Sequence, residues 1–198
     1  WGGVVRRAAV GLRALGRCLY PDVPSGHTAA GGALTGVGVS PRVLDGCIGV
    51  VKAYTTRVGG GPLPTEYAEA MGERVRKLGN EYGATTGRPR RCGWFDAVVV
   101  RYAVRVNGLS ALAVTKLDVL DTLEKIALCT GYHINGELVT EFPGDIADLE
   151  QITPHYEWFE GWMTSTADAR TIEALPPQAR KYLDRIEELV ESPIRYVS

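Results

Sequence analysis

An apolar run at residues 109–114, typical of a buried strand, ends in the tetrapeptide TKLD, residues 115–118. Ligands of α/β proteins bind where the strands end, so these side chains are candidates for a binding site. An ionised Asp118 can accept two hydrogen bonds from the N1–H and exocyclic amine of guanine, and adenine offers no matching pair of donors. Each such bond is worth about 1.5–3 kcal/mol. The stem of Lys116 can cover the base. The alternative is a solvated turn in which Asp118 is an N-cap and Lys116 is exposed.

A second segment, GATTGRPRR at residues 83–91, has the composition of an anion-binding loop. Its arginine guanidiniums suit carboxylates and phosphates, and its glycines let backbone N–H groups approach an anion. The alternatives are a mobile basic loop and a patch that binds nucleic acid. Nucleic acid is disfavoured because the chain has a formal net charge of −1 and no aromatic residues interrupt the basic run.

A third segment, KAYTTRVGGGPLPTE at residues 52–66, leads polar side chains into a tight glycine turn. It is not a Walker A motif, because the printed sequence contains no Gly-Lys dipeptide, and no G-x-G-x-x-G follows a strand. The three histidines (His27, His133 and His155) have no metal-ligand spacing, and we expect them to be structural or exposed.

The composition is that of a globular protein, with 198 residues, 45% hydrophobic and 23% charged. This length allows one large domain or two small ones. The four cysteines (Cys18, Cys47, Cys92 and Cys129) form no CxxC pair, which argues against a zinc site or disulfide scaffold and suits a reducing cytoplasm. No apolar run reaches the roughly 18 residues of a membrane helix, and no signal peptide is recognisable. We therefore expect a cytoplasmic protein that does not bind membranes.

The elements that must position these segments alternate between strands and helices, which predicts an α/β fold. Ser40-Pro41 is expected to open a helix that continues through residue 51, and residues 66–77 are weakly helical. Further helices are predicted at 94–106, 119–123 and 175–190, and strands at 109–114 and 194–197. Asn135-Gly136 predicts a hairpin that joins residues 125–134 to 137–142. A short helix within 1–19 is possible, and residues 25–39 suggest a loop.

Together, the three polar segments resemble adenylosuccinate synthetase, in the same order and at fitting spacing. The resemblance covers residues 19–198 and leaves 1–18 as a diverged N-terminal segment. The matching stretches are KAYTTRVGGGPLPTE (52–66), GNEYGATTGRPRRCGWFDAVVVRYAVRVNGLSALAVTKLDVLD (79–121) and LPPQARKYLDRIEELVESPI (175–194), with a weaker match at LYPDVPSGHTAAGGALTGVGVSPR (19–42). It implies the C-terminal portion of a P-loop-NTPase-like fold, with a mixed sheet, flanking helices and a β-hairpin, forming a single incomplete domain over 19–198.

The resemblance implies a GTP-dependent ligase of purine nucleotide biosynthesis that joins L-aspartate to IMP. The γ-phosphate of GTP is first transferred to the 6-oxygen of IMP, and the aspartate amine then displaces it. The family uses Mg²⁺, and the full-length enzyme is expected to form a homodimer. The implied aspartate and IMP contacts are Ala84, Thr85, Thr86, Gly87, Arg88, Pro89 and Arg90. The implied GTP contacts are Arg90, Lys116, Leu117, Asp118 and Ser198.

Several functional parts of the family have no counterpart in the printed sequence. These are the phosphate loop, the catalytic aspartate that binds Mg²⁺, and the histidine that stabilises the transferred phosphate. Pro24 replaces a threonine that would donate to the IMP phosphate, and proline has no N–H to donate. Because the chain starts at Trp1 and stops directly after a strand-like segment, we expect a fragment. We expect it to be inactive alone, because phosphoryl transfer needs the phosphate and metal groups that are missing. The alternative is a non-catalytic remnant that binds a guanine nucleotide or a carboxylate and needs a partner chain.

Overall fold

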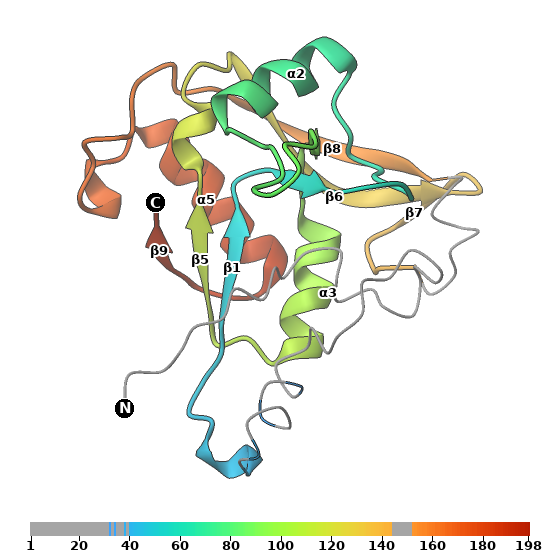
Figure 1. Cartoon of the computed structure of the whole chain (residues 1–198), viewed down its shortest axis with the longest axis vertical. Coiled ribbons are helices and arrows are strands. Elements are labelled where there is room, and N and C mark those ends of the chain that lie inside the picture. The colour runs from blue at the N-terminus through green and yellow to red at the C-terminus, as the bar shows by residue number, and fades with distance from the viewer. Residues whose placement is uncertain (1–31, 33, 35–37, 39, 144–151) are drawn as a thin grey trace.

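The central feature of the fold is a three-stranded parallel sheet, in the order β1 (Ile48–Lys52), β5 (Ala111–Thr115) and β9 (Ile194–Val197). The computed structural model describes residues 32, 34, 38, 40–143 and 152–198. The strands are rich in valine, isoleucine and alanine, as is typical of parallel strands. Figure 1 shows that all three point toward the side of the molecule on which helix α2 (Glu69–Leu78) lies. Their carboxyl ends therefore share one edge.

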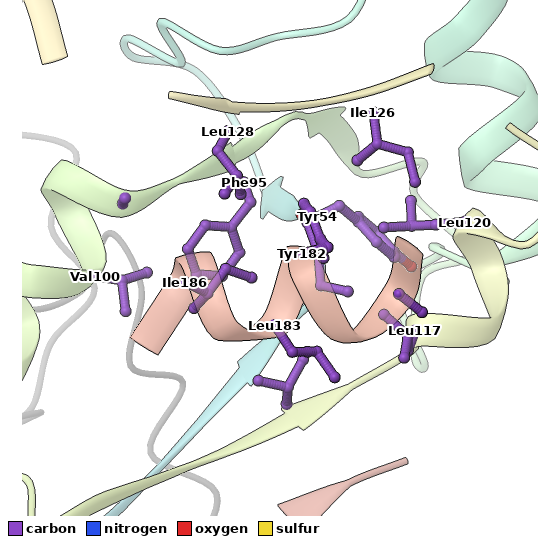
Figure 2. Packing of buried hydrophobic residues seen from close by; sticks show 14 of the residues in the cluster. Tyr54, Phe95, Val100, Leu117, Leu120, Ile126, Leu128, Tyr182, Leu183 and Ile186 are labelled. Carbon is purple, nitrogen blue, oxygen red and sulfur yellow. The ribbon is translucent and has the colours of Figure 1, made fainter. Parts of the chain in front are cut away.

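Two long helices pack around a common core with this sheet. Helix α5 (Pro177–Val190) has proline in its first turn, and its buried residues recur every three or four positions, as an amphipathic helix requires. Helix α3 (Ala97–Asn107) begins at the N-cap Asp96 and ends at Gly108 in the left-handed conformation. Figure 2 shows side chains of α5, such as Tyr182 and Ile186, among those of Tyr54, Phe95 and Leu128.

A second, mixed sheet is built around the long strand β6 (Lys125–Ile134). Strand β4 (Phe95–Asp96) pairs with it in parallel, and β7 (Glu137–Val139) and β8 (Thr153–Glu160) pair with it in antiparallel fashion. The β6–β7 turn has positive φ at Asn135 and Gly136, as a type I′ turn requires. The hairpin extends to one side of the molecule (Figure 1).

The remaining described elements are short. Strands β2 (Thr55–Arg57) and β3 (Arg91–Gly93) form an antiparallel ribbon, with Gly93 so close to Thr65 that a Cβ would lie 2.4 Å from its carbonyl oxygen. Three single-turn 3₁₀ helices complete the described structure: η2 (Pro41–Val43), η3 (Leu117–Leu120) and η4 (Ile172–Ala174).

The predicted α/β fold, with a mixed sheet, flanking helices and a β-hairpin, is confirmed. The helix predicted from Ser40 to residue 51 is wrong. The Ser40 hydroxyl does accept a hydrogen bond from the Arg42 N–H, but the 3₁₀ turn ends at Val43, and Ile48–Lys52 is strand β1. The apolar positions that suggested helical spacing belong to a strand, and a short apolar run does not distinguish the two by periodicity.

Smaller differences concern where elements start. The helix predicted from residue 94 begins at Ala97, because Phe95–Asp96 pairs with β6 first. The short helix predicted at 119–123 is the 3₁₀ turn Leu117–Leu120. Strand β8 was not predicted. The predictions for residues 1–31, including the possible helix, Cys18, Pro24, His27 and the 1–18 boundary, lie outside the described residues, as does most of the loop at 25–39. Within the described part of the chain, no helix has the length and apolar character to cross a bilayer.

Candidate functional site

The carboxyl edge of the parallel sheet brings together three chain segments that are distant in sequence. The Ala53 N–H donates to the Thr115 carbonyl at 2.8 Å, which joins the end of β1 to the end of β5. On the other side of β5, the Ser198 N–H donates to Val114 at 2.9 Å, and the Leu117 N–H donates back to Ser198 at 3.2 Å. Residues 116–118 and Ser198, which the sequence predicts as GTP contacts, therefore lie together at one edge of the sheet.

The turn after β5 separates the side chains of its residues by environment. Lys116 adopts the left-handed conformation, with φ 63° and ψ 33°, which places Leu117 in the core at 1% exposure. Asp118 is exposed, and its carboxylate accepts no hydrogen bond from any residue that the structure describes. The alternative in which Asp118 caps the following turn is therefore wrong: the N-cap position belongs to Lys116, and no side chain caps it.

Lys116 is half-buried rather than exposed, and its ammonium donates to the Gly79 carbonyl at 2.6 Å. Gly79 follows helix α2 and begins the turn that leads into the arginine-rich loop. The segment expected to recognise guanine thus contacts the chain four residues before the segment expected to bind anions, although 37 positions separate Lys116 from Gly79.

The centre of this junction is the buried carboxylate of Glu81, which is 1% exposed. It accepts hydrogen bonds from Lys52 at 2.7 Å, from the Tyr54 hydroxyl at 2.6 Å and from Arg90 at 2.8 Å. Lys52 also donates to the Thr56 hydroxyl at 3.0 Å. A carboxylate with this many charged and neutral donors is fully satisfied despite its burial.

The pKa values around Glu81 follow from burial and from these bonds. Burial alone would raise the Glu81 pKa, but the hydrogen bonds from Lys52, Tyr54 and Arg90 hold it below its ordinary value. Burial lowers the Lys52 pKa, because Glu81 restores only part of the hydration that the ammonium loses. Burial, with the neighbouring carboxylate, raises the pKa of Tyr54 far above its ordinary value. Glu81 is thus an anion, and Tyr54 a neutral donor, at neutral pH.

The predicted anion-binding loop is an exposed hairpin-like turn. Tyr82 and Pro89 form an isolated β-bridge, and the Gly83 N–H donates to the Arg88 carbonyl at 2.8 Å. Gly87 has φ +63°, and its N–H donates to the Gly83 carbonyl at 2.9 Å, which closes the turn. Ala84, Thr85, Thr86, Gly87, Arg88 and Pro89 are all exposed.

The three arginines of this loop do not form one clamp, which corrects the interpretation of residues 83–91. Arg91 points away into a bidentate pair with Glu66, with Nε donating at 2.8 Å, and it also donates to the Gly61 carbonyl. Arg90 is held by Glu81. The Arg88 guanidinium donates to no residue in the described part of the chain, so all of its donors are open to a ligand.

Sequence reasoning did not identify Lys52, Tyr54 and Glu81 as a unit. Lys52 and Tyr54 were noted only as members of a polar segment, and Glu81 lies in the GNEYGATTGR stretch without a motif of its own. The available signal was an acidic residue, Glu81, just before the arginine-rich segment. The sequence alone does not show that Glu81 is buried. The chemical result is one buried carboxylate bonded to two cations, Lys52 and Arg90, with a third cation, Lys116, on the nearby Gly79 carbonyl. This excess of positive charge favours an anionic ligand.

The described residues do not supply a protein-made metal site. Across residues 40–143 and 152–198, no group of three or more His, Cys, Asp or Glu side chains converges. Asp118 is a free carboxylate at this edge, and one carboxylate is fewer than a Mg²⁺ site built by the protein alone would need.

Comparisons with known proteins agree with the geometry. The family model described as adenylosuccinate synthetase matches residues 12–198. Curated adenylosuccinate synthetases from Geobacter sulfurreducens and Thermodesulfovibrio yellowstonii are 56% and 55% identical over 179 residues, which is 90% of this chain and 41% and 42% of those proteins. The solved structure of fully ligated adenylosuccinate synthetase from Plasmodium falciparum superposes with a TM-score of 0.87 at 39% identity, covering 90% of this chain and 43% of that one. The chain thus spans well under half the length of these relatives.

Proposed function

Because this chain belongs to the adenylosuccinate synthetase family, we propose that it forms part of a GTP-dependent ligase that joins L-aspartate to IMP. Its fold is that family's fold over the part that it spans. The observation that carries the proposal is the shared edge at which residues 116–118, Ser198 and the Glu81–Arg90 pair meet. That edge offers a carboxylate for a base and guanidiniums for anions, which are the groups that a nucleotide and a dicarboxylate require.

In this proposal the turn after β5 binds the guanine of GTP. The exposed Asp118 carboxylate is free to accept from N1–H and the exocyclic amine, and the half-buried stem of Lys116 covers a face of the base. Leu117 is fixed in the core, so the turn is positioned before any ligand arrives. The backbone of Ser198, bonded to Leu117, completes the edge of the pocket.

The loop from Ala84 to Arg90 is proposed to bind aspartate, with Arg88 also reaching IMP. The threonine hydroxyls are exposed and able to donate to carboxylate oxygens. Arg90, anchored on Glu81, is proposed to face GTP. The loop would hold the aspartate amine near the 6-position of IMP, where the amine displaces the phosphate transferred from GTP. When bound, Mg²⁺ neutralises the charge of the phosphates during transfer.

The sequence that the relatives have beyond the region matched here is proposed to supply the phosphate loop, the catalytic aspartate and the phosphate-stabilising histidine. Apart from Arg90, the contacts proposed above are to the guanine, aspartate and IMP, whereas phosphoryl transfer depends on several positioned phosphate and metal groups. We therefore propose that the isolated chain binds substrates weakly and makes no product. We further propose a cytoplasmic homodimer for the complete enzyme.

The proposal is tested by an adenylosuccinate assay on two proteins. One is the purified chain with GTP, IMP, aspartate and Mg²⁺, and the other is the same chain joined to the remaining part of the Geobacter sulfurreducens relative. We expect no product from the first and GTP-dependent product from the second. Product from the chain alone would contradict the proposal that the rest of the enzyme supplies the groups for phosphoryl transfer. A joined protein that folds and dimerises, as sedimentation would show, yet neither binds GTP nor makes product would refute the function.

A further inference from the structure

The turn Gly79–Glu81 contacts both halves of the proposed site. On one side, the Gly79 carbonyl accepts from the Lys116 ammonium at 2.6 Å. On the other, Glu81 binds Arg90 twice: its carboxylate accepts from the guanidinium at 2.8 Å, and its carbonyl accepts from the Arg90 N–H at 2.9 Å. One short turn therefore connects the segment proposed for the base with the loop proposed for aspartate.

This turn is held at both of its ends by close contacts with neighbouring groups. A Cβ at Gly79 would lie 2.2 Å from the Tyr54 hydroxyl oxygen, so the backbone can sit here only because the residue is glycine. The Glu81 N–H donates to the Arg76 carbonyl at 2.9 Å, and Arg76 in turn donates from Nε to the Arg90 carbonyl at 2.8 Å. The turn has little freedom to move without breaking several of these bonds.

The charges explain why a carboxylate is needed at this point. Lys52 and Arg90 have only 24% and 30% of their side chains exposed, and both contact the same Glu81 oxygen. Without the carboxylate, two half-buried cations would face each other in a medium that screens them poorly. The Arg90 Nε–H is buried and makes no hydrogen bond within the described residues, so among them the Glu81 carboxylate is the hydrogen-bond partner that holds this guanidinium in place.

We propose that Glu81 is a positioning residue, which orients Arg90 for an anionic nucleotide and, through the Gly79–Glu81 turn, fixes Arg90 relative to Lys116. Its carboxylate is enclosed by protein donors and only 1% of Glu81 is exposed, so it is not open to a ligand. Glu81 therefore acts through Arg90 rather than on the ligand. The identity of the nucleotide in this role rests on the proposed function, but the contacts between Glu81 and Arg90 exist in the free chain.

The first test uses the free chain and hydrogen exchange. In Glu81→Gln we expect amides of residues 83–90 to exchange about 10-fold faster, because the neutral amide loses the charge-assisted bond that holds the loop base. Amides in β6 should be unchanged. The control is Glu66→Gln, which removes the neighbouring and more exposed Arg91 pair and should change exchange at 83–90 less than about twofold. Unchanged exchange in Glu81→Gln would overturn the proposal without reference to any ligand.

The second test is a double-mutant cycle on GTP affinity in the chain joined to the remaining part of the Geobacter sulfurreducens relative. We expect Glu81→Gln to weaken GTP binding about 10-fold when Arg90 is present and to have no effect in an Arg90→Ala background. Glu81→Asp, which keeps the charge, should recover part of the affinity. An equal loss in both backgrounds would show a general structural role and overturn the proposal. If the unmodified joined protein binds no GTP, the proposed function fails, and the exchange result alone decides whether Glu81 positions Arg90.

Discussion

Asp96 has a carboxyl group that is wholly buried between the start of α3 and strand β6. Its Oδ1 accepts from the Val99 N–H at 3.2 Å as the N-cap, and its Oδ2 accepts from the Tyr132 hydroxyl at 2.6 Å. Burial outweighs these bonds and raises the pKa of Asp96 to about 6, against an ordinary value of 3.8. The folded chain therefore retains a proton here that the unfolded chain has already lost.

The sign of the effect on stability follows from this difference. Between about pH 4 and pH 6 the folded state binds more protons at Asp96 than the unfolded state, so the stability that this residue contributes falls as the pH rises. Two pKa units correspond to about 3 kcal/mol, at about 1.4 kcal/mol for each unit. Glu66 and Glu81, whose pKa values are lowered, have the opposite dependence, so the wild type alone does not isolate the effect.

The Asp96→Asn variant isolates the pH dependence that Asp96 contributes to stability, because asparagine is an equally good N-cap but does not titrate. The free energy of unfolding, measured with urea for both proteins from pH 4 to pH 7.5, gives the difference at each pH. We expect the variant to gain about 2–3 kcal/mol relative to wild type between pH 4 and pH 7. A difference that stays constant across this range would show that Asp96 is ionised in the fold and would refute the reasoning.

Two further predictions concern the packing of the described core. Gly161→Ala should destabilise the fold by about 1–3 kcal/mol, because the new Cβ would lie 1.7 Å from the Leu123 carbonyl oxygen. The matched control Gly60→Ala places a Cβ where nothing lies within 4 Å, so it should have little effect in the same thermal melt. Iodoacetamide should label Cys47 before Cys92, because Cys47 is partly exposed and burial raises the Cys92 pKa to about 11. Mass spectrometry of digests taken over time checks this order, and faster labelling of Cys92 would mean that the core opens readily.

The parts of the fold that the sequence predicted are those with strong local signals. Helix α5 has proline at its start and a regular apolar face, and the hairpin has Asn135-Gly136 between two strand patterns, so neither needs distant information. The sequence predicts a helix at strand β1 because the pairing partner that makes it a strand, β5, lies about 60 positions away and is not visible in the local pattern. Strand β8 was not predicted because Pro154 is unusual within a strand. The proline is tolerated because β8 lies at the edge of the described sheet, where it pairs with β6.

The same distinction applies to the candidate site. The position of Asp118 just after a buried strand was predictable from the apolar run that precedes it, and strand ends are where α/β proteins bind ligands. The Glu81 cluster was not predictable, because its bonds to Lys52 and Tyr54 join residues 29 and 27 positions apart. The grouping of Arg88, Arg90 and Arg91 failed for the same reason, since the partner carboxylates that separate them are not visible in a nine-residue window.

The proposed guanine pocket is tested most directly by the nucleotide preference of Asp118→Asn in the joined, full-length protein. The substitution replaces one acceptor oxygen with a donor that would face a donor of guanine, and it leaves the exposed turn unchanged in shape. We expect GTP affinity to fall by about 2–4 kcal/mol. Affinity for the xanthine nucleotide should rise relative to GTP, because its 2-oxo group can accept from the new amide. Equal GTP affinity in wild type and Asp118→Asn would contradict the assignment of residues 116–118 to guanine recognition.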